Sequence, residues 1–206
     1  MKGFRKSLLP LGLFAAVALQ GCVPVLIGAG GAAAVTSLED RRSTGAQIDD
    51  ESIEIRATNR VNDRFGDRAH VNVTSYNRIA LVTGEVPDER ARDEVEKIVL
   101  AVPNVRGVTN DVQLAGVSSL GSRANDSYLT TKGRGRLLDT KRISPVHVKV
   151  VSEAGVVYLM GIVTEPEADE AVEIARTTGG VRKVVKAFEY CKPGDERCPP
   201  PKKAGS

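Results

Sequence analysis

Residues 71–99 read VNVTSYNRIALVTGEVPDERARDEVEKIV, and residues 148–176 read VKVVSEAGVVYLMGIVTEPEADEAVEIAR. The two stretches are copies of each other. Their identical or matching positions include His70/His147, Ser75/Ser152, Gly84/Gly161 and Glu96/Glu173, and the match extends to Asp50/Asp126 and Val105/Val181. The repeat has a period near 76 residues. This is too long for a solenoid unit and is typical of two tandem small domains.

Each copy predicts the same order of elements. In the first copy, apolar residues four apart over 50–65 indicate an amphipathic helix, and alternating residues from 71 to 84 indicate two strands. A second helix is expected before residue 102 and a third strand over 105–114. The second copy adds a capping-box pattern at Thr164 and Glu167. The order α-β-β-α-β predicts an α+β fold in which each domain has a three-stranded mixed sheet with both helices on one face.

The N-terminus has the pattern of an export signal. Three cations precede an apolar run from Leu8 to Leu19, which is too short to span a bilayer. Leu19-Gln20-Gly21-Cys22 resembles a bacterial lipoprotein processing site, which predicts cleavage before Cys22 and acylation of its thiol, with palmitate among the expected lipids. An uncleaved anchor helix is the alternative, although Pro24 and the glycines that follow disfavour it.

The positive net charge of the chain comes from the predicted signal. The full chain has 29 basic and 26 acidic residues, and residues 1–21 hold three of the cations and no acid, so the remainder is neutral. Nucleic-acid binding therefore loses its main electrostatic support. The charge is unevenly distributed: residues 46–115 hold 9 cations and 13 acids, whereas residues 126–142 hold five cations and two acids among apolar side chains.

The duplicated unit resembles the BON domain, in the strand glycines Gly84 and Gly161 and in the closing patterns Val105-x-x-Val108 and Val181-x-x-Val184. With LQGCV, TGAQIDD and NDSYLTTK, the chain up to Tyr190 is similar to the dual-BON outer-membrane lipoproteins of Gram-negative bacteria. The resemblance implies a non-enzymatic protein, lipid-anchored at the periplasmic face of the outer membrane. It also implies binding of anionic phospholipid, support of envelope integrity and a place in cell division.

The domain boundaries follow from composition and from the repeat. We expect a signal peptide at 1–21, a lipidated N-terminus and tether at 22–45, BON domain 1 at 46–115, a linker at 116–123, BON domain 2 at 124–190 and a Pro/Lys-rich tail at 191–206.

The resemblance attributes the lipid surface to the first helix of the second domain. The residues predicted to contact lipid are Tyr128, Leu129, Lys132, Arg134, Arg136, Leu137 and Lys141. Cations interleaved with apolar residues suit an anionic membrane surface, although Gly133 and Gly135 are expected to interrupt the helix. The alternative interpretation of the segment is a merely solvated basic face, with Leu129 and Leu137 packed on the sheet. An adaptor or chaperone for envelope proteins is the alternative function.

Other chemistry is sparse. Cys191 and Cys198 bracket a Pro-Gly turn, which predicts a local disulfide in an oxidising periplasm, with free thiols or a partner-linked bridge as alternatives. His70 and His147 occupy equivalent repeat positions and are interpreted as strand-edge polar residues. Neither has an obvious nucleophile and orienting acid, so we expect no catalytic site, metal or cofactor.

Overall fold

The computed structural model describes residues 40–140, 143–192 and 194–198. These residues belong to one compact unit, Leu38–Ser206. The predicted signal peptide, the lipidation site Cys22 and Lys141 lie outside the described residues.

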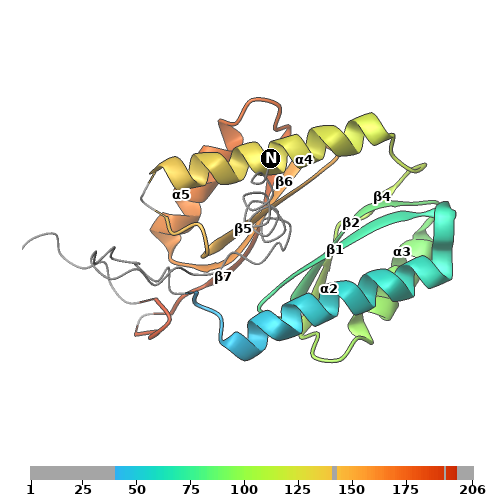
Figure 1. Ribbon diagram of the computed structural model, residues 1–206, viewed down its shortest axis with the longest axis horizontal. Helices are drawn as coiled ribbons and strands as arrows, with labels where there is room; N and C mark the ends of the chain where they lie inside the picture. Colours follow the sequence, from blue (N-terminus) through green and yellow to red (C-terminus); the bar gives the residue numbers. More distant parts are fainter. Residues whose placement is uncertain (1–39, 141–142, 193, 199–206) are drawn as a thin grey trace, which may run out of the picture. The chain divides into compact units, whose positions relative to one another are not determined.

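The first repeat begins with the long helix α2 (Thr44–Phe65), which Ser43 caps by accepting a hydrogen bond from the Ala46 N–H at 3.1 Å. A short 3-10 turn, η1 (Gly66–Arg68), leads into β1 (His70–Tyr76) and β2 (Ile79–Val86), which pair antiparallel. Helix α3 (Glu89–Leu100) returns the chain, so that β3 (Gly107–Asn110) and β4 (Gln113–Leu114) both pair parallel with β2. Figure 1 shows α2 and α3 on the same face of this sheet.

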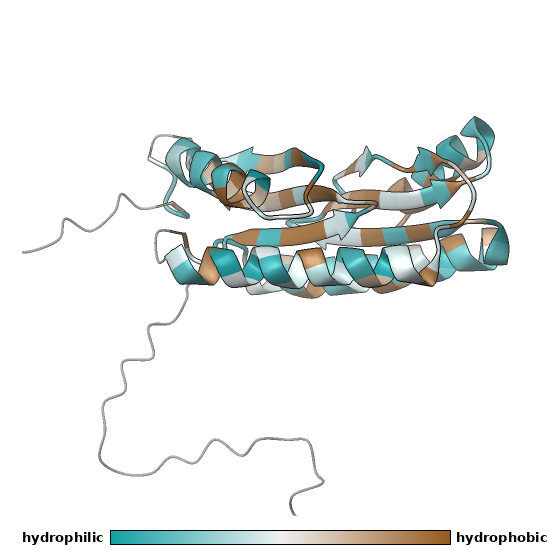
Figure 2. Cartoon of the chain, turned by 90° about the horizontal axis from the view of Figure 1, so that it is seen from above, coloured by the Kyte–Doolittle hydropathy of each residue, from teal (hydrophilic) through white to brown (hydrophobic). Residues whose placement is uncertain are grey.

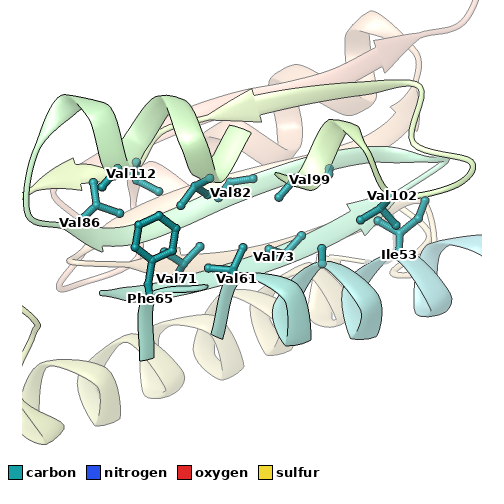
Figure 3. Packing of buried hydrophobic residues seen from close by; sticks show 14 residues of the cluster. Ile53, Val61, Phe65, Val71, Val73, Val82, Val86, Val99, Val102 and Val112 are labelled. Carbon is teal, nitrogen blue, oxygen red and sulfur yellow. The ribbon is translucent and has the colours of Figure 1, made fainter. Parts of the chain in front are cut away.

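The core of the first repeat lies between its two helices and its sheet. Figure 3 shows Ile53, Val61 and Phe65 of α2 directed at strand residues such as Val73 and Val82, with Val99 of α3 completing the cluster. The apolar residues at steps of four and three along α2 all point to this side. The helix is therefore held in place by packing as well as by its own hydrogen bonds.

The second repeat has the same architecture. Helix α4 (Leu120–Thr140) is followed by the antiparallel pair β5 (Val148–Glu153) and β6 (Val156–Val163). Helix α5 (Glu165–Arg176) then leads to β7 (Lys183–Tyr190), which runs parallel to β6. The predicted capping box is confirmed, because the Thr164 N–H donates to the Glu167 carboxylate at 2.8 Å. The predicted α+β fold with mixed three-stranded sheets is thereby confirmed.

Three local predictions differ from the structure. Helix α4 begins at Leu120, so the end of the predicted linker 116–123 is helical, and α2 begins inside the predicted tether 22–45. The expected single strand over 105–114 is divided into β3 and β4, and Val112 between them is buried in the core. Both helix starts precede the apolar periodicity, which had placed them later.

The two sheets pack against each other through the faces that their helices leave open. Tyr76 and Leu81 of the first repeat meet Tyr158, Met160 and Ile162 of the second in one buried cluster. These residues alternate along their strands with residues that face the helices, as a strand buried on both sides requires. Figure 2 shows apolar residues along the strands of both sheets and mixed hydropathy along the helices.

Candidate functional site

Helix α4 presents an exposed face that combines apolar and cationic side chains. Tyr128 and Leu138 are 60% and 56% exposed, and they are among several large apolar residues that the described surface leaves exposed. With about 3.6 residues per turn, both lie on the outward side, and Lys132 and Arg134 flank them on either side. The Lys132 ammonium lies 5.6 Å from the centre of the Tyr128 ring. This face has the composition of an interfacial helix.

Two residues predicted to contact lipid are instead part of the core, and for them the prediction is wrong. Leu129 and Leu137 are 1% and 2% exposed, because they lie on the opposite side of α4, against the second sheet and Gly180. Gly133 lies on that same side. The predicted interruption at Gly133 and Gly135 is wrong as well: α4 is continuous, and a Cβ on Gly133 would come within 3.3 Å of Val150. The glycine therefore permits close approach of helix and sheet.

Arg136, also predicted to contact lipid, is used within the fold. Its guanidinium donates to the Ile174 carbonyl at 2.7 Å and to the hydroxyls of Thr178 and Thr177 at 2.7 and 3.0 Å. It therefore binds the C-terminus of α5, where a helix favours a cation. Arg134, by contrast, is exposed and makes one weak bond of 3.3 Å to the Val150 carbonyl.

A pocket of about 350 Å³ adjoins the C-terminal end of this face. Arg134 and Leu138 line one side, and Arg42 and Tyr76 of the first repeat line the other. The Arg42 guanidinium stacks 4.2 Å from the centre of the Tyr76 ring and pairs with Asp40 and Asp50 at 2.7 and 2.9 Å. Among the described residues, Arg134 is therefore a cation of this pocket that has no carboxylate partner.

The segment that precedes α2 is fixed to the second repeat, which the sequence did not indicate. Arg41 donates to the Ile162 carbonyl at 2.8 Å and to both carboxylate oxygens of Glu167 at 2.7 and 2.8 Å. Burial alone would raise the pKa of Glu167, but the hydrogen bonds from His147, Arg41 and Thr164 hold it well below its usual range. The first described residues are therefore fixed to the second repeat, and Asp40 lines the same pocket as Leu138.

Polar side chains also join the repeats. Lys149 Nζ lies 2.6 Å from Glu54, Asn77 donates to Glu189 at 2.8 Å, and the Tyr158 hydroxyl donates to Asp111 at 2.8 Å. At the other end of the interface, Glu153 is buried and accepts a hydrogen bond from Asn72 at 2.6 Å. Burial raises the pKa of Glu153, the hydrogen bond from Asn72 acts in the opposite direction, and Glu85 nearby adds to the rise.

The Glu153 carboxyl predicts a pH dependence of stability. A carboxyl whose pKa is higher in the folded than in the unfolded chain binds more protons when the chain is folded. Ionising it therefore lowers the free energy of unfolding, and this loss grows as the pH rises above the ordinary pKa of 4.5. We therefore expect Glu153→Gln to be more stable than the parent at pH 7, because it removes this cost and keeps the oxygen that Asn72 needs. Urea unfolding at several pH values measures the difference, which is expected to shrink toward pH 4.

The exposed Glu51→Gln substitution removes the same charge without burial and serves as the control. A Glu153→Gln protein less stable than the parent at pH 7 would mean that the ionised carboxylate is favourable at the interface.

The remaining predicted residues take structural positions. Cys191 and Cys198 are joined by a disulfide, with 6.2 Å between their Cα atoms, and they adjoin the cluster between the sheets. His70 and His147 are half-buried, and His147 lies 3.7 Å from Glu167.

In the described part of the chain, no three His, Cys, Asp or Glu side chains come together as metal ligands would. Among the same residues, no helix has the length and apolar character needed to cross a membrane.

A Cβ on Gly84 or Gly161 would overlap the backbone carbonyl of His70 or His147 in the neighbouring strand. The two strand glycines are thus required by the close approach of each hairpin's strands. Both repeats match the BON domain family, the first over residues 49–116 and the second over residues 125–192.

The chain belongs to the BON-domain family.

The chain is also similar to several named proteins over more than half of its length. The chain is 38% identical over 180 residues to outer membrane lipoprotein DolP of Haemophilus influenzae, covering 86% of this chain and 93% of that protein. It is 33% identical over 153 residues to the 21 kDa hemolysin of Actinobacillus pleuropneumoniae, covering 73% and 79%. Osmotically-inducible protein Y of Escherichia coli is 27% identical over 117 residues, covering 55% and 58%. The BON protein described here is thus similar to an outer membrane lipoprotein over most of its length.

Proposed function

We propose that this BON protein is a non-enzymatic outer-membrane lipoprotein, anchored through Cys22, that binds anionic phospholipid through the exposed face of α4 and so supports envelope integrity. The observation that carries the proposal is the pairing on one helix face of Tyr128 and Leu138, both largely exposed, with Lys132 and Arg134 on their flanks. Apolar side chains of this kind enter the boundary between headgroups and acyl chains, while flanking cations meet lipid phosphates.

The rest of the fold supports this orientation. Residues 46–115 carry a net charge of −4, from 9 cations and 13 acids, so an anionic membrane repels the first BON domain. The described chain begins at Asp40, which lines the same pocket as Arg134 and Leu138. The described chain therefore begins beside the lipid-facing end of α4, and we expect the anchor at Cys22 and this helix to engage the same bilayer.

Vesicle flotation of residues 38–206, the compact unit without the anchor, tests the proposal. We expect binding to phosphatidylglycerol-containing vesicles and none to pure phosphatidylcholine vesicles. The double variant Lys132→Ala/Arg134→Ala is expected to lose about 2 kcal/mol of binding, roughly a 30-fold weaker affinity, because each cation contributes about 1 kcal/mol at an anionic surface.

A matched control removes two exposed cations from the first domain, in the variant Arg56→Ala/Arg90→Ala. This variant is expected to bind as the parent does. Equal flotation with both vesicle types, or equal weakening in the two double variants, would contradict the proposal and leave the role of a protein adaptor.

A further inference from the structure

The two repeats differ at one buried aspartate that the sequence alignment had paired. In the first repeat, Asp50 accepts hydrogen bonds from the Asn77 and Arg78 N–H groups at 2.8 and 2.6 Å. It also accepts one from the Ser75 hydroxyl at 2.7 Å, and the Arg42 guanidinium pairs with it at 2.9 Å. Four donors, one of them a full cation, thus satisfy this carboxylate.

Asp126 holds the equivalent turn of the second repeat with fewer partners. It accepts hydrogen bonds from the Ala154 and Gly155 N–H groups at 2.9 and 2.8 Å, as Asp50 does from its own turn. Within the described residues, no cation pairs with Asp126, although it is only 5% exposed. The hydroxyl of Ser152, the counterpart of Ser75, is buried and finds no hydrogen-bond partner in the part of the chain that the structure describes. Two of the four interactions made in the first repeat are therefore missing.

A pocket of about 420 Å³ lies at this position. Asp126, Ser152 and Glu153 line it from the second repeat, and His70 and Asn72 line it from β1 of the first. A second carboxylate, Glu153, is thus buried beside Asp126, and burial raises its pKa. A buried carboxylate without a cation is unfavourable, and a pocket of this size admits a small polar ligand.

The arginine that lines this pocket already makes hydrogen bonds elsewhere. Arg123 lines the same pocket, but its guanidinium donates to the hydroxyl and carbonyl of Ser118 at 3.2 and 3.1 Å. His70, the other basic group at the pocket, is bonded to Asn72 at 3.3 Å. The carboxylates of Asp126 and Glu153 therefore face the pocket without a guanidinium of their own.

We propose that this pocket binds the guanidinium group of an external ligand, placed against Asp126 as Arg42 is placed against Asp50. A guanidinium is planar and carries several fixed N–H donors, so one group reaches a carboxylate and a neighbouring hydroxyl at once. Asp126, Ser152 and Glu153 offer that set of acceptors. The site is separate from the outward side chains of α4 and holds a cation, whereas the lipid-facing surface attracts an anion.

Amide NMR of the full chain in maltoside micelles, titrated with methylguanidinium chloride, tests the proposal. We expect saturable shifts of the Ala154 and Gly155 amides and none at the equivalent Asn77 and Arg78 amides, because Arg42 already occupies the first site. Arg42→Ala is expected to make Asn77 and Arg78 respond as well. Tetramethylammonium chloride has the same charge but no N–H donor and is expected to shift neither pair. A Gly-Arg-Gly peptide that binds more tightly than methylguanidinium identifies the source as an arginine side chain, and a weaker one identifies a free guanidinium compound.

Variants at the pocket separate ligand binding from folding. Asp126→Asn is expected to abolish the response, but it also weakens the turn, so Ser152→Ala and Glu153→Gln, which leave Asp126 in place, provide the second test. Each is expected to weaken methylguanidinium binding at least threefold. The proposal is overturned if the Ala154 and Gly155 amides do not shift saturably, if tetramethylammonium shifts them equally, or if they respond only in Arg123→Ala. The last result would mean that Arg123 itself fills the pocket.

Discussion

Replacing Gly84 by alanine is expected to unfold the first BON domain, at a cost of about 3 kcal/mol or more. Gly84 lies in β2 with φ of +112°, a backbone conformation that side chains disfavour. Its missing Cβ also leaves the space that the His70 carbonyl occupies in β1. The overlapping atom belongs to the backbone, so relief requires β1 and β2 to separate, and the two strands pair along their whole length.

Urea unfolding followed by circular dichroism measures this cost. Gly135→Ala is the matched control, since it places a methyl group in open space on the continuous helix α4. It is expected to stabilise the protein by up to about 1 kcal/mol, because alanine is the better helix former. A Gly84→Ala protein within 1 kcal/mol of the parent would show that the hairpin accommodates the methyl group.

Replacing Asp50 by alanine is expected to cost about 3–5 kcal/mol, as the loss of one partner from a buried ion pair does. The substitution leaves the Asn77 and Arg78 N–H groups and the Ser75 hydroxyl without their acceptor and removes a partner of the Arg42 guanidinium. Asn77 and Arg78 both have positive φ, so their turn relies on these bonds. Asp126→Ala breaks two of the hydrogen bonds found among the described residues rather than four, and it is expected to cost less.

Asp49→Ala provides the comparison for Asp50. Asp49 is the preceding residue of the same helix, and its carboxylate pairs with Arg78 at 2.7 Å near the surface. A partly exposed pair contributes at most about 1 kcal/mol. Thermal or urea unfolding of the two variants side by side gives the difference, and equal costs would contradict the role assigned to the buried carboxylate.

The secondary structure was largely predictable because most of its signals are local. Strand alternation and helical spacing gave the order of elements in both repeats, and Thr164 with Glu167 marked the start of α5 correctly. Aligning Asp50 with Asp126 was also possible from the sequence. Their contacts were not, because the turn that each carboxylate holds lies more than 20 residues away in the chain.

The candidate lipid surface was predicted as a segment but not as a face. The cations of residues 126–142 identified the helix, yet the residues predicted to contact lipid included both Tyr128 and Leu129, and both Arg134 and Arg136. Successive residues on a helix point about 100° apart and residues two apart point about 200° apart, so in each pair one side chain is exposed and the other contacts the core or α5. Which one is exposed depends on where the sheet lies.

By itself, the sequence determined the duplication and the α+β fold of each repeat, because these depend on residue type and on spacing along the chain. The tertiary structure alone decided that the two sheets share a buried cluster, that Arg41 and Arg42 fix the entering segment, and that Asp126 faces a pocket where Asp50 faces a guanidinium. These features join residues far apart in the chain. They arise from packing between the repeats, which no pattern within either repeat encodes.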